Sequence, residues 1–151
     1  MYITMNAVRA HLDPDEPDYT KAAELGPDAI PYLEEIVNGT DTMLASKAAY
    51  LASLIKSDKS VSLLETAASN REPIVRIAAA SGLRNISEED ANRVSDRLIE
   101  DNDAGVRKVT LKSTSNFNSP ALVAKVQKLS EKDPEQFIRD LASSTISKMR
   151  Q

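Results

Sequence analysis

The sequence lacks cysteine and tryptophan, and it contains one histidine, His11, among 151 residues. Without cysteine the chain can form no disulfide, offers no thiolate nucleophile and cannot hold zinc through sulfur. A single imidazole also removes most histidine-based acid–base chemistry. Aromatic residues make up only 4%, so a core must consist mainly of Leu, Ile, Val and Ala. That composition favours closely packed helices.

Long apolar runs are also missing. No stretch approaches the roughly 18 to 20 residues that span a bilayer, and Asn6, Arg9 and His11 interrupt the region where a secretory signal would need continuous apolar residues. We therefore expect no membrane contact and take the cytoplasm as the default location. The net charge of −4 disfavours a phosphate backbone as partner.

What the chain does contain is a repeat. Four basic residues recur at intervals of 29, 31 and 32 positions, and each has an Asp or Asn six positions earlier. The pairs are Asp41 and Lys47, Asn70 and Arg76, Asp101 and Arg107, and Asp133 and Arg139. Two independent columns thus share one register, as expected of stacked repeats.

Each unit shows helical periodicity in two blocks, which predicts a helix hairpin. The expected first helices are 28–38, 59–69, 88–100 and 120–131, and the expected second helices are 42–56, 73–86, 104–117 and 135–149. Ser87 with Asp90 resembles a capping box, and Ser119–Pro120 and Asp133–Pro134 place Pro at a first helical position. One domain over 1–151 follows, with an N-terminal helical cap at 1–26 and repeats at 27–57, 58–86, 87–117 and 118–151.

The segment from Asn70 to Leu83, with Pro73, Val75 and Arg76 followed by alanines, resembles the short bacterial form of the HEAT repeat found in phycobilisome lyase-like proteins. The resemblance covers roughly 15–149 and implies an all-α, right-handed α-solenoid of about four hairpins. Asn70 replaces the usual acid of the family, and Lys47 replaces Arg. Further departures, where Ala or Leu is common, are Thr110, Ser113, Thr114, Ser143 and Thr145.

The two polar columns predict a structural ladder. An Asp or Asn before a second helix can cap it, and the basic residue inside that helix can bridge to the acid of the next unit. Such bridges tie solenoid neighbours in register. The ladder residues are Asp41, Lys47, Asn70, Arg76, Asp101, Arg107, Asp133 and Arg139.

The outward face of the second helices predicts a concave partner-binding groove roughly 30–40 Å long, at 8–10 Å per helix neighbour. Three columns would line it: Ala48, Ile77, Lys108 and Asp140; Ala49, Ala78, Val109 and Leu141; and Ala52, Ser81, Lys112 and Ser144. An exposed apolar strip of this kind typically marks a partner surface. We expect the partner to contact Ile77, Ala78, Ser81, Lys108, Val109, Lys112, Leu141 and Ser144.

The function predicted from this groove is a non-enzymatic protein-binding scaffold without metal or cofactor. His11 has no clear nucleophile beside it, no Gly-x-Ser-x-Gly turn occurs, and the four glycines are too far apart for a phosphate loop. The acidic stretches at 13–18 and 101–105 are interpreted as a solvated turn and a helix cap, because neither has the ligand spacing of a calcium loop.

Three alternatives remain open. The resemblance to lyase-like proteins implies a possible accessory part in bilin attachment or removal. A basic strip could bind nucleic acid, although stacking aromatics are scarce; it would consist of Arg84, Arg107, Lys108, Lys112, Lys125 and Lys128. The last hairpin could also self-associate weakly, because Phe137, Ile138 and Ile146 need cover and no further repeat follows.

Overall fold

The computed structural model describes residues 2–151, and its regular secondary structure is helical throughout that range. No strand occurs in that range. The N-terminal part contains α1 (Met5–Leu12), α2 (Tyr19–Ala22), the 3-10 turns Ala23–Leu25 and Pro27–Ala29, and α3 (Ile30–Val37). The rest contains α4 (Thr42–Ser53), α5 (Asp58–Ala68), α6 (Pro73–Gly82), the 3-10 turn Leu83–Asn85, α7 (Glu88–Leu98), α8 (Ala104–Thr114), α9 (Pro120–Lys132) and α10 (Gln136–Met149).

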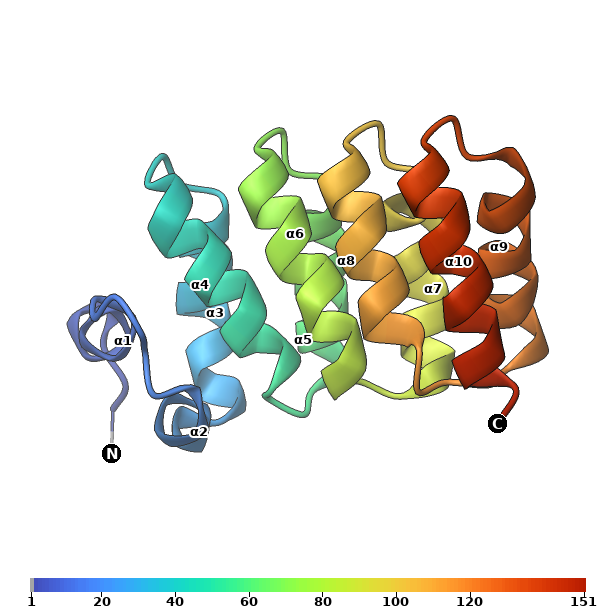
Figure 1. The fold of residues 1–151 in the computed structure, drawn as a ribbon. Coiled ribbons are helices and arrows are strands. Elements are labelled where there is room, and N and C mark those ends of the chain that lie inside the picture. The colour runs from blue at the N-terminus through green and yellow to red at the C-terminus, as the bar shows by residue number, and fades with distance from the viewer. Residues whose placement is uncertain (1) are drawn as a thin grey trace.

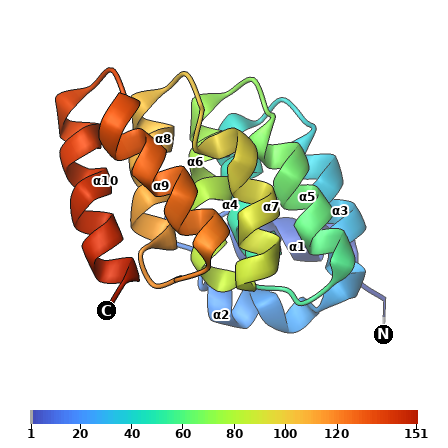
Figure 2. The same cartoon turned by 90° about the vertical axis from the view of Figure 1, so that its right-hand side faces the viewer.

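Four helix hairpins stand side by side in chain order. In Figure 1 the second helices, α4, α6, α8 and α10, form the front layer, and the first helices, α3, α5, α7 and α9, lie behind them. Figure 2 shows the same two layers from the C-terminal end. The predicted all-α solenoid is confirmed, and each of the eight repeat helices begins within two residues of its predicted start.

Local capping explains where these helices begin. Asp41, Ser87, Asp103 and Ser119 each accept a hydrogen bond from the backbone N–H three residues on, which satisfies a donor that has no partner within the helix. Pro120 follows Ser119 at the first position of α9, as predicted.

The prediction that Pro134 opens α10 is wrong. The helix begins at Gln136, and Glu135 is its extended N-cap residue. The Asp133 carboxylate accepts the backbone N–H of Glu135 at 2.9 Å, and this bond holds 133–135 in a turn before the helix starts.

The apolar core is divided at α8. One cluster of buried residues runs from Val8 to Val106 and a second from Ile99 to Met149, with Phe117 packed against both. Between them α8 buries several polar side chains: Arg107, Thr110, Ser113 and Thr114. The Thr110 and Thr114 hydroxyls donate to carbonyls of their own helix, so these buried groups are satisfied. The third and fourth repeats therefore meet through polar groups together with apolar contacts of Ile99 and Leu111 in the second cluster.

The N-terminal segment folds back onto the first repeat. The Tyr19 ring packs edge-to-face on Tyr50 with centroids 4.9 Å apart, and the Tyr32 hydroxyl donates to the Ile3 carbonyl. Burial, and then the neighbouring Tyr50, raises the pKa of the Tyr19 phenol. The Tyr19 side chain is therefore partly shielded from solvent where it packs against α4.

Helices α4 and α6 approach closely where Gly82 faces Ser53. A Cβ atom built on Gly82 would lie 2.6 Å from the Ser53 Cβ and 2.9 Å from its Oγ. The same hydroxyl accepts a hydrogen bond from the Asn85 amide at 3.0 Å. Ser53 therefore cannot swing away freely, and glycine is the residue that fits this crossing.

Replacing Gly82 with alanine tests this contact. We expect Gly82→Ala to lower the free energy of unfolding by about 1–2 kcal/mol, because overpacking costs more here than the better helix propensity of alanine returns. Urea denaturation followed by circular dichroism measures the change. Ser81→Ala, one residue earlier in α6 and half-buried, is the matched control and should stay within about 0.5 kcal/mol. A Gly82→Ala variant as stable as the wild type would contradict this account of the crossing.

Candidate functional site

Two ion pairs, one half-buried and one buried, join consecutive repeats along the edge where the hairpins turn. Arg76 Nε lies 2.7 Å from Asp101 Oδ2, and its Nη2 donates to Oδ1 at 3.2 Å. Arg107 makes the same two bonds to Asp133, at 2.7 and 3.1 Å. The Arg107 and Asp133 side chains are only 8% and 1% exposed, so this bidentate pair is shielded from solvent.

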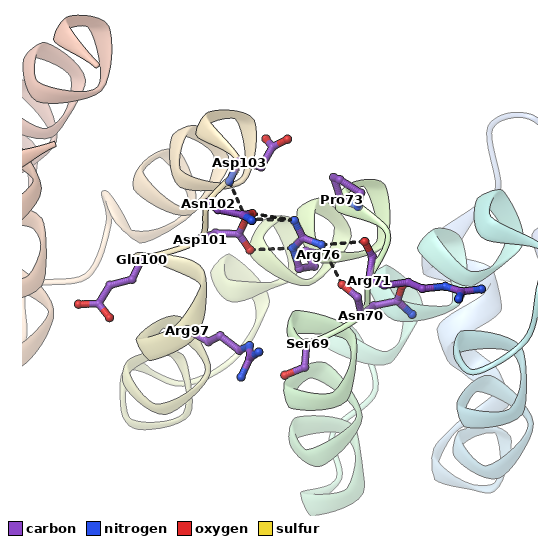
Figure 3. Close-up of a pocket in the computed structure, with 10 residues that line it drawn as sticks. All are labelled: Ser69, Asn70, Arg71, Pro73, Arg76, Arg97, Glu100, Asp101, Asn102 and Asp103. Atoms are coloured by element: carbon purple, nitrogen blue, oxygen red, sulfur yellow. Dashed lines mark hydrogen bonds and ion pairs between the residues drawn. The ribbon is translucent and has the colours of Figure 1, made fainter. Parts of the chain in front are cut away.

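The same groups also close the turns. The third guanidinium nitrogen of Arg76 donates to the Asn70 carbonyl, and that of Arg107 donates to the Asp101 carbonyl. Asp101 in turn accepts the N–H of Asp103 at 2.9 Å. Each acid therefore shapes its own turn and binds the arginine of the preceding repeat, as Figure 3 shows for Arg76.

The predicted bridge between the first and second repeats, from Lys47 to Asn70, is wrong. Lys47 Nζ donates to the Pro14 carbonyl at 2.8 Å, and the Asn70 amide donates to the Val37 carbonyl at 3.3 Å. The two departures from the repeat pattern are thus the two partners of one missing ion pair. A lysine lacks the planar fork of arginine, and an asparagine lacks the charge to hold it.

The capping role predicted for the ladder acids holds at Asp41, which caps α4. It is wrong at Asn70, Asp101 and Asp133, which each lie two residues before the N-cap residue of the following helix. Arg139, at the C-terminal end of the ladder, donates to the Asp133 carbonyl and to Gln136.

A polar cleft of about 810 Å³ opens between the α5–α6 and α7–α8 turns (Figure 3). Basic and acidic residues line it in equal number, Arg71, Arg76 and Arg97 beside Glu100, Asp101 and Asp103. Asp101 is committed to Arg76 and Asp103 caps α8, which agrees with interpreting 101–105 as a cap. Within residues 2–151 no group of three His, Asp or Glu side chains is placed to hold a metal ion.

The outer face of α6, α8 and α10 carries the residues predicted to meet a partner. Lys108, Lys112 and Ser144 are exposed, whereas five others are half-buried: Ile77, Ala78, Ser81, Val109 and Leu141. The term outer face is used from here on for the surface that these eight residues form on α6, α8 and α10. Its three helices stand in the front layer of Figure 1.

Two apolar residues of the outer face were not assigned to the groove from the sequence, although Phe137 was expected to need cover. Ile74 is 37% exposed and Phe137 is 50% exposed. Both lie two residues before the repeated arginine, so an extra column in the same register would have found them.

The prediction that the groove begins at α4 is wrong, because Ala48, Ala49 and Ala52 are fully buried. Helix α4 is packed against α1, α3, α5 and α6, and Tyr19 lies on Tyr50. The outer face is therefore open over three helices and is closed at its N-terminal end by the cap.

The predicted basic strip does not form as one surface. Arg107 is buried against Asp133, while Lys125 and Lys128 of α9 pair with Asp96 and Glu100 of the rear layer. The reason given for self-association is also wrong for two of its three residues. Ile138 and Ile146 are 0% and 6% exposed within the chain itself, which leaves Phe137.

These hairpins, tied by repeated arginine–aspartate pairs, define an α-helical repeat solenoid. A family model described as HEAT repeats matches residues 61–147, more than half of the chain. The chain belongs to the HEAT-repeat family. Among curated proteins no relative matches it, and the phycobilisome lyase-like subtype stays a prediction. In residues 2–151 no helix is long and apolar enough to cross a bilayer.

The contribution of the buried Asp133 carboxylate to stability can be tested with a single isosteric substitution. Asp133→Asn keeps an acceptor for the Glu135 N–H but leaves the Arg107 guanidinium buried without a counter-charge. We expect the free energy of unfolding to fall by about 3–5 kcal/mol. Asp96→Asn makes the same change in the exposed partner of Lys125 and should cost less than about 1 kcal/mol. Equal losses in the two variants, measured by urea denaturation, would rule out a special role for the buried pair.

Proposed function

We propose that this protein is a non-enzymatic scaffold that binds a protein partner on the outer face of α6, α8 and α10. HEAT repeats generally act as protein-interaction scaffolds, and the proposal assigns that role to one surface of this chain. The fold alone does not select it, since one fold serves many functions.

The observation that carries the proposal is the gathering of apolar side chains on this face. They come from three helices that pack in succession, α6 against α8 and α8 against α10. The residues are Ile74, Ile77, Val109, Phe137 and Leu141, all of them exposed or half-buried. A solvent-facing apolar surface spread over neighbouring elements is typical of a protein-binding site.

The way the hairpins are held supports the same function. The Arg76–Asp101 pair holds α6 against the third repeat, and the Arg107–Asp133 pair holds α8 against the fourth. A surface built on helices held in register needs little ordering when a partner binds, so less of the interaction energy is lost.

The non-enzymatic part of the proposal rests on the chemistry of the outer face. Its charged groups are Lys108, Lys112 and Asp140, with no histidine among its residues. His11 lies in α1, in the N-terminal cap. No nucleophile and base are brought together here, which is the arrangement that covalent or acid–base catalysis would use.

Capture from a lysate of the native host tests the proposal. We expect the wild type to retain a protein, identified by mass spectrometry, that is lost from both Val109→Glu and Leu141→Glu, because each places a charge in the apolar centre. Ala124→Glu introduces the same charge at an exposed position of α9 in the rear layer and should retain the partner. Circular dichroism establishes that all variants fold.

Identical retention by all folded variants, or no retained protein, would contradict binding at the outer face. An absorbance shift on mixing the wild type with a bilin would then favour the lyase-like alternative.

A further inference from the structure

The two layers of the solenoid differ in charge. Helices α4, α6 and α8 contain no Asp or Glu at all, and α10 contains a single one, Asp140. By contrast, the first turn of α7 alone contains Glu88, Glu89 and Asp90. The acidic side chains that make the whole molecule negative therefore lie mainly away from the outer face.

Within the outer face, the middle is positive and unneutralised. Lys108 and Lys112 are exposed, and neither forms an ion pair or a side-chain hydrogen bond in residues 2–151. They lie one helical turn apart on α8, about 6 Å by the rise of an α-helix. An approaching carboxylate would meet these two lysines and no competing acid on α6 or α8.

Beside this positive region the outer face is hollowed. A cavity of about 320 Å³ lies between α4 and α6, and its lining is mainly apolar: Tyr19, Ser46, Lys47, Tyr50, Ile74, Ile77, Ala78 and Ser81. That volume is at the lower end of the roughly 300–1,000 Å³ typical of ligand pockets. It suits a side chain of a partner better than a bulky cofactor.

We propose that the partner segment is an acidic peptide with one apolar anchor residue. The anchor fills the hollow between α4 and α6, and the carboxylates pair with Lys108 and Lys112. Neighbouring helices lie roughly 8–10 Å apart and an extended chain advances about 3.3 Å per residue. The lysines of α8 are about one and a half helix spacings from a hollow between α4 and α6, so the acidic residues lie about four positions from the anchor. This inference rests on the proposed function, whose surface it shares.

The apolar surroundings favour a peptide over a nucleic acid. Ile77 lines the hollow and Val109 follows Lys108 on α8, and a phosphate backbone would gain nothing from either side chain. Asp140 on the adjacent α10 would repel a phosphate chain continuing along the face. A peptide that alternates apolar and acidic residues matches both the hollow and the lysines.

Selection from a displayed library of random 12-residue peptides on the purified full-length protein tests the proposal. We expect the wild type to enrich peptides with Asp or Glu about four residues from a large apolar residue. Synthetic copies should bind at least 10-fold more weakly to the Lys108→Glu/Lys112→Glu variant and to Ile77→Glu, as measured by fluorescence anisotropy. Their affinity for the wild type should fall as salt is raised.

The matched control reverses two lysines in the rear layer. Lys59→Glu/Lys132→Glu carries the same change in net charge at exposed positions of α5 and α9 and should bind the selected peptides as the wild type does. A general effect of net charge would weaken binding to both double variants equally and would overturn the assignment of Lys108 and Lys112.

Three other results would overturn the inference. They are selected peptides without acidic enrichment, the absence of any enriched peptide, and retention of a single-stranded DNA oligonucleotide that depends on Lys108 and Lys112 when no peptide binds. A lysate partner lost with Val109→Glu but kept by the double lysine reversal would leave the scaffold function intact and overturn only the acidic partner.

Discussion

The structure depends on one recurring contact, in which a buried carboxylate serves two neighbours at once. Asp101 and Asp133 each accept the N–H two residues on, which shapes their own turn, and each holds the guanidinium of the preceding repeat. The shape of a turn is thereby coupled to the position of the adjacent hairpin. Where this contact is missing, between α4 and α6, the close approach of Gly82 to Ser53 fixes the spacing by direct packing instead.

Much of this fold could be predicted because its signals are local. The arginine column reveals the repeat, and residues such as Ser87 and Ser119 mark helix starts through bonds that reach only three positions along the chain. The fate of Lys47 could not be predicted in this way. Its partner, the Pro14 carbonyl, lies 33 residues earlier, and only the folding of the cap onto α4 brings the two together.

In the candidate site too, some features follow from local sequence and others from contacts between distant parts of the chain. Its columns on α6, α8 and α10 follow from periodicity, whereas its N-terminal limit depends on Tyr19 meeting Tyr50 across the fold. Net charge was the least informative property, because it sums two layers of different composition. The value of −4 describes neither the acidic first turn of α7 nor the region around Lys108, where a partner would feel the local field rather than the total.

The division of the apolar core makes the solenoid unevenly stable along its length. One cluster of buried residues runs through the first three repeats, and a second, smaller one joins Ile99 and Leu111 of the third repeat to the last hairpin. Separating that hairpin would break the Arg107–Asp133 pair and expose the second cluster. Because fewer buried apolar residues hold α9 and α10 than hold α4 and α6, the C-terminal hairpin would open first in a local unfolding event.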